Sequence, residues 1–523
     1  MLNTPKSLRG MVTSPHHLAS QAGLSVLQDG GTAVEAGVAI AACLAVVYPH
    51  MTGIGGDGFW LIAEPGKDVR AVDACGGAAQ AADLDLYARA GLSAVPWRGP
   101  LAANTVAGTI SGWQVALAGD PGTLSLERLL RDAIHHAEAG IVLTAGGAEI
   151  AKAKDAELRD VPGYAAHFGL LAEGAILKQP ALARTLRRLA ADGLQDYYDG
   201  ALARDIAADL AAAGSPVSAA DLAAHRASAP PPLTVQIKGA QLYNTAPPTQ
   251  GAASLLILAL FDRLAAAQAD GFDHVHGLVE ATKQAFLFRD VHVGDRAYMT
   301  VDPQALLDDG AALDAMAARI DPALALPWPQ PSQAGDTVWF GAIDGAGRVA
   351  SIIQSTYFEF GSGVVLPETG ITWQNRGASF RLAPDGWNAL KPGRKPFHTL
   401  NPALARFDDG RVMAYGTMGG EGQPQTQAAV FSRYARFGIP LQAAITAPRW
   451  LLGKTWGDDS VTLTRESRFD PEVNAALRDA GHDVELLGAF TATMGHAGAL
   501  VGHPDGVIEG ATDPRSDGAV AAW

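Results

Sequence analysis

The sequence has little cysteine, an excess of acidic over basic residues and no long apolar run. Of its 523 residues, two are cysteines, Cys43 and Cys75, which are too few for a disulfide framework. Lysine and arginine number 39 against 54 aspartates and glutamates. The net charge of −15 argues against a nucleic-acid partner, since proteins that bind phosphate backbones need a basic patch. No stretch approaches the ~18 apolar residues of a membrane span, so we expect no membrane partner.

The first ten residues lack a signal peptide, which needs an apolar stretch of roughly 7–15 residues. We therefore expect a cytoplasmic protein. Hydrophobic residues make up 48% of the chain and charged residues 18%, a balance typical of a globular protein with an ample core. Cys43 lies in the apolar run 41–47 and is expected in that core.

The most informative stretch begins at Thr337. Residues 337–343 are rich in β-branched and aromatic side chains, and Gly345-Ala346-Gly347 is typical of a hairpin turn before a return strand over 349–355. A Pro-rich connection, 327–335, precedes this hairpin. A flexible segment that leads directly into a strand opening on threonine indicates a chain cut there to create a new N-terminus. The alternative is an ordinary hairpin after a loop.

A threonine at a new N-terminus carries its own base. Its free α-amine has a pKa of roughly 7.7–8.0, so near neutral pH it accepts the proton of the hydroxyl on the same residue.

Apolar periodicity and capping residues predict several helices and strands elsewhere in the chain. Ser14 and Pro15 are expected to open the first helix, in which the adjacent His16 and His17 would point in different directions and so not form a paired metal site. The other expected helices are 32–47, several between 123 and 226, 254–267, 274–288, 424–436 and 470–480. The expected strands are 59–62, 410–416 and 493–501.

Several short motifs occur in a fixed order around the threonine. They include Gly53-Ile54-Gly55-Gly56-Asp57-Gly58-Phe59, Pro247-Pro248-Thr249-Gln250-Gly251, Phe360-Gly361-Ser362-Gly363, Met418-Gly419-Gly420 and Ala447-Pro448-Arg449-Trp450. In this order and spacing the chain resembles the gamma-glutamyltransferase family of N-terminal-nucleophile hydrolases. The resemblance implies an α+β fold, a four-layer αββα sandwich, without cofactor or metal. It also implies a large subunit, 1–336, and a small subunit, 337–523, that together form one such unit after self-cleavage.

The family pattern assigns catalytic roles to four residues. Thr337 would be the nucleophile, first against the Asp336 carbonyl and later against a substrate amide. Gly419 and Gly420 match the glycines whose N–H groups hold the oxyanion, and glycine allows such close approach. Ser355 stands where the family has a threonine hydroxyl that supports the amine of the nucleophile.

The positions that read the substrate depart from the family pattern. Cys75 falls where gamma-glutamyl enzymes have an arginine, Tyr357 replaces an asparagine and Ser379 replaces an aspartate that would bind an α-amino group. Arg376 stands in the segment of an Asn-Asn-Gln motif, and His398-Thr399 replaces paired serines. A buried ammonium without its carboxylate is costly, so recognition of an α-amine is expected to be lost. Arg376 could bind a carboxylate instead or be structural, and His398 could donate to the same group or cap the loop.

Within the family, the oxamate amidohydrolase branch is the most similar. The similarity rests on residues 48–56, 374–377, 419–428, 493–499 and 510–515. It implies an amidohydrolase that converts oxamate and water to oxalate and ammonia. The expected partners are a small amide substrate and the protein's own cleaved subunit in an α–β heterodimer, with a dimer of heterodimers left open. A gamma-glutamyltransferase that acts on glutathione and an uncleaved scaffold are the alternatives.

Overall fold

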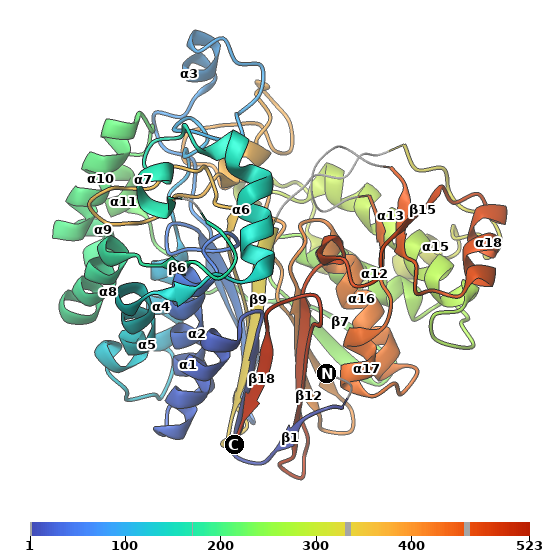
Figure 1. Ribbon diagram of the computed structural model, residues 1–523. Coiled ribbons are helices and arrows are strands. Elements are labelled where there is room, and N and C mark those ends of the chain that lie inside the picture. Colours follow the sequence, from blue (N-terminus) through green and yellow to red (C-terminus); the bar gives the residue numbers. More distant parts are fainter. Residues whose placement is uncertain (1–2, 170, 330–335, 454–460) are drawn as a thin grey trace.

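Two antiparallel sheets lie face to face between helical layers in the computed structural model, which describes residues 3–169, 171–329, 336–453 and 461–523 (Figure 1). One sheet has the strand order β18-β2-β9-β10-β3-β4. Its strands are β18 (Ala519–Ala522), β2 (Gly10–Ser14), β9 (Asp336–Asp344), β10 (Val349–Tyr357), β3 (Asp57–Ala63) and β4 (Arg70–Ala74). The strand that carries Thr337 therefore lies inside this sheet, between β2 and β10.

The facing sheet has the order β1-β17-β16-β12-β11-β8-β7. Its strands are β1 (Lys6–Ser7), β17 (Ile508–Thr512), β16 (Ala497–Gly502), β12 (Val412–Thr417), β11 (Ala403–Phe407), β8 (Ala240–Asn244) and β7 (Leu233–Ile237). Smaller sheets join β13 (Trp450–Leu452), β14 (Leu463–Glu466) and β15 (Val484–Leu487), and β5 (Ile141–Val142) with β6 (Ile176–Leu177). Both large sheets combine strands from before and after Thr337.

Helices cover the outer face of each large sheet, which gives the four-layer α+β sandwich that the sequence predicts (Figure 1). The layer on the Thr337 sheet contains α1 (His17–Gln28), α2 (Ala33–Val47) and α4 (Thr109–Ala118), with α5 (Leu126–Ala139) and α8 (Pro180–Asp192) packed outside. The layer on the other sheet contains α12 (Gly251–Phe261), α13 (Phe272–His292), α16 (Gly422–Ala435) and α17 (Leu441–Thr446).

Further helices surround these layers. They are α3 (Leu84–Arg89), α6 (Ala145–Leu158), α7 (Tyr164–Phe168), α9 (Asp196–Asp199), α10 (Ala201–Ala213), α11 (Ala219–Ala224), α14 (Pro303–Asp308), α15 (Gly310–Ala317) and α18 (Pro471–Asp479), with 3-10 turns η1 (Arg296–Tyr298), η2 (Arg376–Ser379) and η3 (Ala492–Met494).

Apolar side chains fill the space between the two sheets. Trp339 of β9 lies there, 2% exposed, with its indole against the backbone of Gly416 on β12 and Gly498 on β16. A Cβ built on either glycine would lie within 2.5 Å of the indole, so no other residue fits opposite it. Because side chains alternate along a strand, Thr337 faces the same inter-sheet space as Trp339.

The start of the first helix differs from the prediction. Ser14 is the last residue of β2, and α1 begins at His17 with His16 as its N-cap, whose Nδ1 accepts the Leu18 N–H at 3.3 Å. Because His16 precedes the helix, its ring stacks on that of His17, with centroids 4.6 Å apart, instead of pointing away from it. The prediction of diverging rings was wrong for this reason.

Most other predicted elements are confirmed, with shifted ends. Helix α2 begins after Thr32, whose side chain forms a capping box with Glu35. Helix α12 runs over 251–261 instead of 254–267, and α13 extends the prediction at both ends. The last predicted strand, 493–501, is confirmed as β16 from Ala497 onward. Both cysteines are free and buried, and Cys43 lies in the core as predicted.

Among the residues that the structure describes, no helix combines the length and the apolar character needed to cross a membrane.

Candidate active site

Thr337 is the second residue of β9 and is fully buried at one end of the inter-sheet space. The predicted cleavage point, the bond between Asp336 and Thr337, lies at the start of this strand. Of the Pro-rich connection 327–335, residues 330–335 lie outside the described part of the chain.

A β-bulge lies directly opposite Thr337. Val338 pairs with Gln354 and Asp336 pairs with Tyr357, so both Ser355 and Thr356 face the single residue Thr337. Bulges of this kind re-aim side chains and are frequent beside active sites. The Ser355 hydroxyl is buried here and accepts the Tyr357 N–H at 2.7 Å. The sequence-predicted pair, Thr337 and Ser355, is therefore brought together on adjacent strands.

Gly419 and Gly420 connect β12 to the N-terminus of α16. Their φ angles are +114° and +50°, and the Gly422 N–H donates to the Gly419 carbonyl at 2.7 Å, which closes a tight turn. The side-chain amide of Gln250 holds the Gly420 carbonyl at 2.8 Å. Such a turn before a helix presents backbone N–H groups with a positive partial charge.

The start of α16 contacts Thr337 directly. Nε2 of Gln423, which is fully buried, lies 3.4 Å from Oγ1 of Thr337. Gln423 lies in the stretch 419–428, which carries the family resemblance without giving this residue a role. Its position three residues after the glycine pair is the signal that could have identified it.

Arg376 lies fully buried in η2, close to the Tyr357 ring. Its guanidinium carbon is 3.5 Å from the ring centroid, and Nη2 donates to Oγ1 of Thr399 at 3.1 Å. Nε and Nη1 are buried without a hydrogen-bond partner in the part of the chain that the structure describes. Tyr357 adopts a φ of +85°, and burial raises the pKa of its hydroxyl to about 12. The site therefore holds a buried cation with two nitrogen donors that have no partner among the described residues.

His398 donates to Asp57 across the site. Its Nε2 lies 3.1 Å from Oδ2 of Asp57, and its Nδ1 accepts the Leu400 N–H at 3.4 Å, which fixes the proton on Nε2. Burial, followed by the nearby Arg376, lowers the pKa of His398 well below its usual value, so this contact is a hydrogen bond from a neutral ring. Both ring nitrogens are thus used within the protein, and a substrate contact of His398 stays a prediction.

Asp57 is a second residue that the sequence analysis placed in a motif without a role. Its Oδ1 accepts from the backbone N–H of Gly76 and Gly108 at 3.2 and 3.1 Å and from Gln374 Nε2 at 3.1 Å. Burial nevertheless outweighs these hydrogen bonds and the field of Arg376, and it raises the pKa of Asp57 to about 7. A carboxylate inside the glycine loop is the signal that could have marked it.

Ser379 and Cys75 complete the predicted positions. The Ser379 hydroxyl donates to the Phe397 carbonyl at 3.3 Å. Cys75 is fully buried, and burial, followed by the charge of Asp57, raises the pKa of its thiol. Its Sγ donates to the Gly76 carbonyl at 3.5 Å. A small neutral thiol thus stands where the family pattern has a cation.

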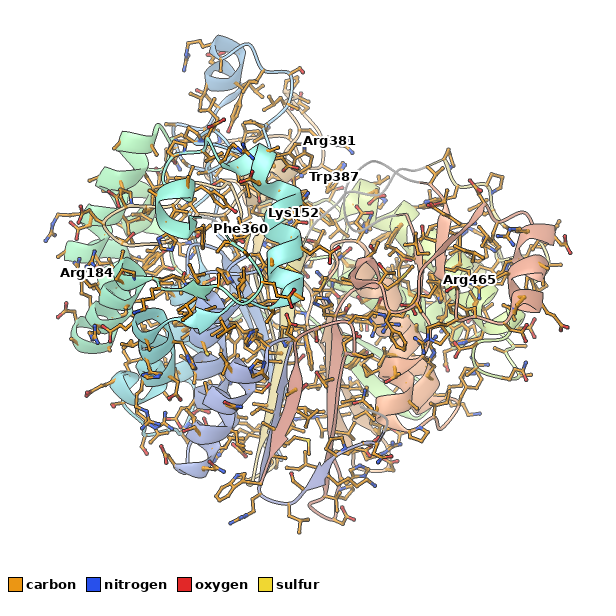
Figure 2. The ribbon with its side chains drawn as sticks, in the orientation of Figure 1. Lys152, Arg184, Phe360, Arg381, Trp387 and Arg465 are labelled. Carbon is orange, nitrogen blue, oxygen red and sulfur yellow. The ribbon has the colours of Figure 1, made fainter. Side chains whose placement is uncertain are left out.

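Arg381 and Trp387, from the segment between Arg376 and His398, lie in the upper part of Figure 2. The two side chains lie together there, with the guanidinium carbon 5.3 Å from the ring centroid.

Two groups of described residues have the spacing of metal ligands. The first is Asp57, Cys75 and His398, whose polar atoms make the hydrogen bonds given above. The second is His276, Glu280 and His482, none of which is among the predicted site residues. In that group the two rings share a 2.9 Å hydrogen bond and Lys283 Nζ lies 2.7 Å from Glu280. These hydrogen bonds account for both groups without a metal ion.

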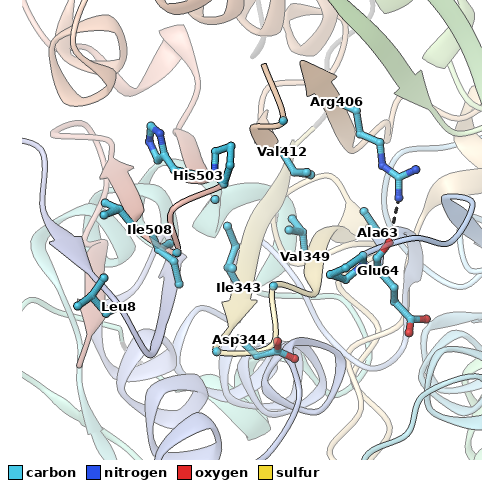
Figure 3. A pocket seen from close by; sticks show the side chains of 18 of the residues that line it. Leu8, Ala63, Glu64, Ile343, Asp344, Val349, Arg406, Val412, His503 and Ile508 are labelled. Atoms are coloured by element: carbon cyan, nitrogen blue, oxygen red, sulfur yellow. Dashed lines mark hydrogen bonds between the residues drawn. The ribbon is translucent and has the colours of Figure 1, made fainter. Parts of the chain in front are cut away.

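A cavity of about 440 Å³ opens at the other end of the sandwich (Figure 3). It lies beside Ile343 and Asp344, roughly 20 Å along the extended strand from Thr337 at ~3.3 Å per residue. Nη2 of Arg406 donates to the Glu64 carbonyl at its edge, at 3.1 Å. This cavity is therefore separate from Thr337.

The chain matches known proteins over nearly its whole length. Residues 19–523 match the family described as gamma-glutamyltranspeptidase. The oxamate amidohydrolase proenzyme of Klebsiella pneumoniae is 54% identical, with 99% of each chain covered. The glutathione hydrolase-like YwrD proenzyme of Bacillus subtilis is 38% identical, with 97% of each covered. The crystal structure of cephalosporin acylase from Bacillus halodurans superposes with a TM-score of 0.92 at 32% identity, covering 100% of this chain and 97% of that one.

Proposed function

The chain belongs to the gamma-glutamyltranspeptidase family of amide-bond hydrolases, and we propose that it is a self-cleaving amidohydrolase whose substrate is a small amide bearing a carboxylate, such as oxamate. The proposed products are oxalate and ammonia. Thr337 is the proposed nucleophile, with Ser355, Gly419 and Gly420 in support, and Arg376 is the proposed reader of the substrate carboxylate.

The proposed reaction uses the hydroxyl and the α-amine of Thr337. The amine takes the proton of Oγ1 while Oγ1 bonds to the amide carbon. The C–N bond then breaks, the leaving nitrogen takes the proton and departs as ammonia, and an oxalyl ester remains on Thr337. Water, with the amine again as base, attacks this ester, the C–Oγ1 bond breaks and oxalate leaves. Each attack places negative charge on a carbonyl oxygen, where one backbone donor from Gly419 or Gly420 lowers the barrier by ~3–4 kcal/mol.

Maturation would use the same oxygen. Before cleavage the Thr337 nitrogen belongs to the peptide bond, so Oγ1 attacks the Asp336 carbonyl and water hydrolyses the resulting ester to give subunits 1–336 and 337–523. Strand β9 pairs with β2 of the first subunit, and β10 pairs with β3. These hydrogen-bonded strand pairs join the two subunits, which supports the proposal that the cleavage products remain an α–β heterodimer.

The substrate class rests on one observation, the two nitrogen donors of buried Arg376 that have no partner in the described part of the chain. A buried cation is costly unless it is paired, and a planar guanidinium matches a carboxylate with two parallel hydrogen bonds. Thr399 and the Tyr357 ring hold the guanidinium in place while leaving Nε and Nη1 unused. Nε and Nη1 do not share a donor edge, because Cδ lies between them, so a substrate carboxylate would pair with one of them and with the second N–H of Nη2. Ser379, where the family pattern has an aspartate, adds no negative charge for an α-amine.

Two measurements test the proposal. Intact-mass analysis should give two polypeptides that meet between residues 336 and 337, and Thr337→Ala should stay at full length. The cleaved protein should release ammonia from oxamate, with no release by Thr337→Ala. A protein that stays uncut after long incubation, or cuts equally well as Thr337→Ala, contradicts the nucleophile.

The glutathione-hydrolase alternative is kept because one relative carries such a name at 38% identity. Brisk turnover of a chromogenic gamma-glutamyl anilide would favour it and would contradict the substrate roles given to Cys75, Tyr357 and Ser379. The uncleaved scaffold requires that no cleavage and no turnover occur. A cytoplasmic location stays a prediction, which cell fractionation would check.

A further inference from the structure

The side chain of Gln423 makes a contact with Thr337 that the reaction described above does not use. Gln423 is the second residue of α16 and is fully buried. Its Nε2 lies 3.4 Å from the nucleophile oxygen. Whether this group donates to Oγ1 or accepts from it depends on which end of the amide faces the threonine, and the surrounding hydrogen bonds decide that question.

A chain of hydrogen bonds fixes the orientation, starting from Asn401. One atom of the Asn401 amide faces the Thr399 carbonyl at 3.0 Å, and because a carbonyl only accepts, that atom is the nitrogen. The Asn401 oxygen accepts from the Ser254 hydroxyl at 2.7 Å, in agreement with this assignment. The same Asn401 nitrogen lies 3.1 Å from Gln423, so the oxygen of Gln423 faces it. The NH₂ group of Gln423 must then face Thr337.

We propose that Gln423 is a catalytic residue that donates a hydrogen bond to Oγ1 of Thr337, with Asn401 as the residue that positions it. This proposal rests on Thr337 being the nucleophile. A donor on Oγ1 withdraws electron density when Oγ1 attacks, so it brings little gain in forming the ester. During hydrolysis of the ester, the C–Oγ1 bond breaks, its electron pair moves to Oγ1 and the amine returns the proton. A hydrogen bond from Gln423 stabilises the negative charge that develops on Oγ1 in this step. The gain therefore falls on hydrolysis of the ester.

The same network connects the nucleophile to the substrate-reading arginine. Thr399 accepts from Arg376 through its hydroxyl and from Asn401 through its carbonyl. Thr399 thus helps to position both Arg376, which would bind the substrate carboxylate, and Asn401, which orients the Gln423 donor.

The test compares two glutamines of the same helix. Gln423→Leu keeps the size of the side chain and removes the donor, and Gln423→Glu places a carboxylate oxygen against Oγ1. Gln425→Leu is the matched control, because Gln425 is equally buried but bonds to the backbone of Glu421 and Leu452. All variants are assayed after complete self-cleavage, with oxamate as substrate.

We expect Gln423→Leu to lower kcat by about 10- to 100-fold, somewhat less than the loss of an oxyanion donor, because the contact is long. Since ester hydrolysis becomes limiting, KM should fall with kcat while kcat/KM changes little. Intact mass during turnover should show the small subunit carrying an oxalyl group in Gln423→Leu and not in Gln425→Leu. A fall in kcat/KM at unchanged KM without this adduct, or equal behaviour of the two leucine variants, would overturn the proposal.

A failure of the proposed substrate would be distinguishable from a failure of this inference. If the wild type releases no ammonia from oxamate while Thr337→Ala still blocks self-cleavage, the variants are compared on the rate of self-cleavage. The ester of that reaction has the same leaving oxygen. Accumulation of a hydroxylamine-sensitive ester in Gln423→Leu alone supports the donor, and a rate equal to that of Gln425→Leu overturns it.

Discussion

Replacing Arg376 tests the substrate class most directly, because its two unused donors are the observation on which that class rests. We compare oxamate with oxamide, which has the same size and carries a second neutral amide in place of the carboxylate. The quantity of interest is the ratio of kcat/KM for this pair. Destabilisation of the protein would lower both values, whereas loss of a carboxylate contact lowers the value for oxamate alone.

The expected size follows from the burial of the site. Arg376 is fully buried, so a substrate carboxylate bound beside it leaves water. Truncating one partner of a buried, hydrogen-bonded charge pair costs about 2–5 kcal/mol, or roughly 30-fold to several-thousand-fold at ~1.4 kcal/mol per factor of ten. We expect Arg376→Ala to lower the ratio of kcat/KM for oxamate to that for oxamide by an amount in this range.

Arg376→Lys should lie between the wild type and the alanine variant. Lysine keeps the charge but lacks the planar pair of donors, the hydrogen bond to Thr399 and the stack on Tyr357. Losing one charge-assisted hydrogen bond costs about 1.5–3 kcal/mol, which predicts a ratio lowered roughly 10- to 150-fold.

Arg433→Lys serves as the control for disturbing a buried arginine. Arg433 is also fully buried, and its Nη2 lies 2.6 Å from the carboxylate of Asp270. This variant should lower the melting temperature and leave the ratio unchanged. If Arg376→Ala keeps the wild-type ratio within twofold, or if Arg433→Lys shifts it as much, Arg376 is a structural residue and the substrate class fails.

Two further predictions concern the glycine turn and Asp57. Gly419→Ala should lower kcat about 100-fold, because alanine does not adopt a φ of +114° and the backbone donors would be displaced. Gly420→Ala should lower kcat much less, because a φ of +50° is open to alanine at a small cost. Equal losses of kcat in the two variants would contradict the role of the turn. Burial raises the pKa of Asp57 from 3.8 to about 7. Between these pH values the folded protein keeps a proton that the unfolded chain has lost. The contribution of Asp57 to the free energy of unfolding therefore falls as pH rises through this range. Asparagine does not titrate, so the melting temperature of Asp57→Asn, measured relative to that of the wild type, should rise from pH 5 to pH 7.5. A change of the opposite sign would refute the raised pKa of Asp57.

Local patterns were sufficient to predict much of this protein. The hairpin at Thr337 follows from alternating side chains and a glycine turn, which depend on neighbours along the chain. The glycine pair before α16 and the Thr32 cap of α2 are likewise local signals. The motifs in order also identified the family and hence the sandwich. The start of α1 was wrong because Ser14 fits an N-cap by type, while its pairing in β2 with β18 is decided by the C-terminal end of the chain.

The contacts within the site required the tertiary structure. His398 and Asp57 are 341 positions apart, and Gln423 is 86 positions from Thr337, so nothing along the chain shows that they meet. The sequence by itself determined the fold family and the residue types in the site, and it predicts Thr337 as the nucleophile. Only the tertiary structure decided which nitrogen of His398 carries the proton, which donors of Arg376 remain unused and which end of the Gln423 amide faces Thr337. These properties depend on burial and on hydrogen bonds between segments that folding alone brings together.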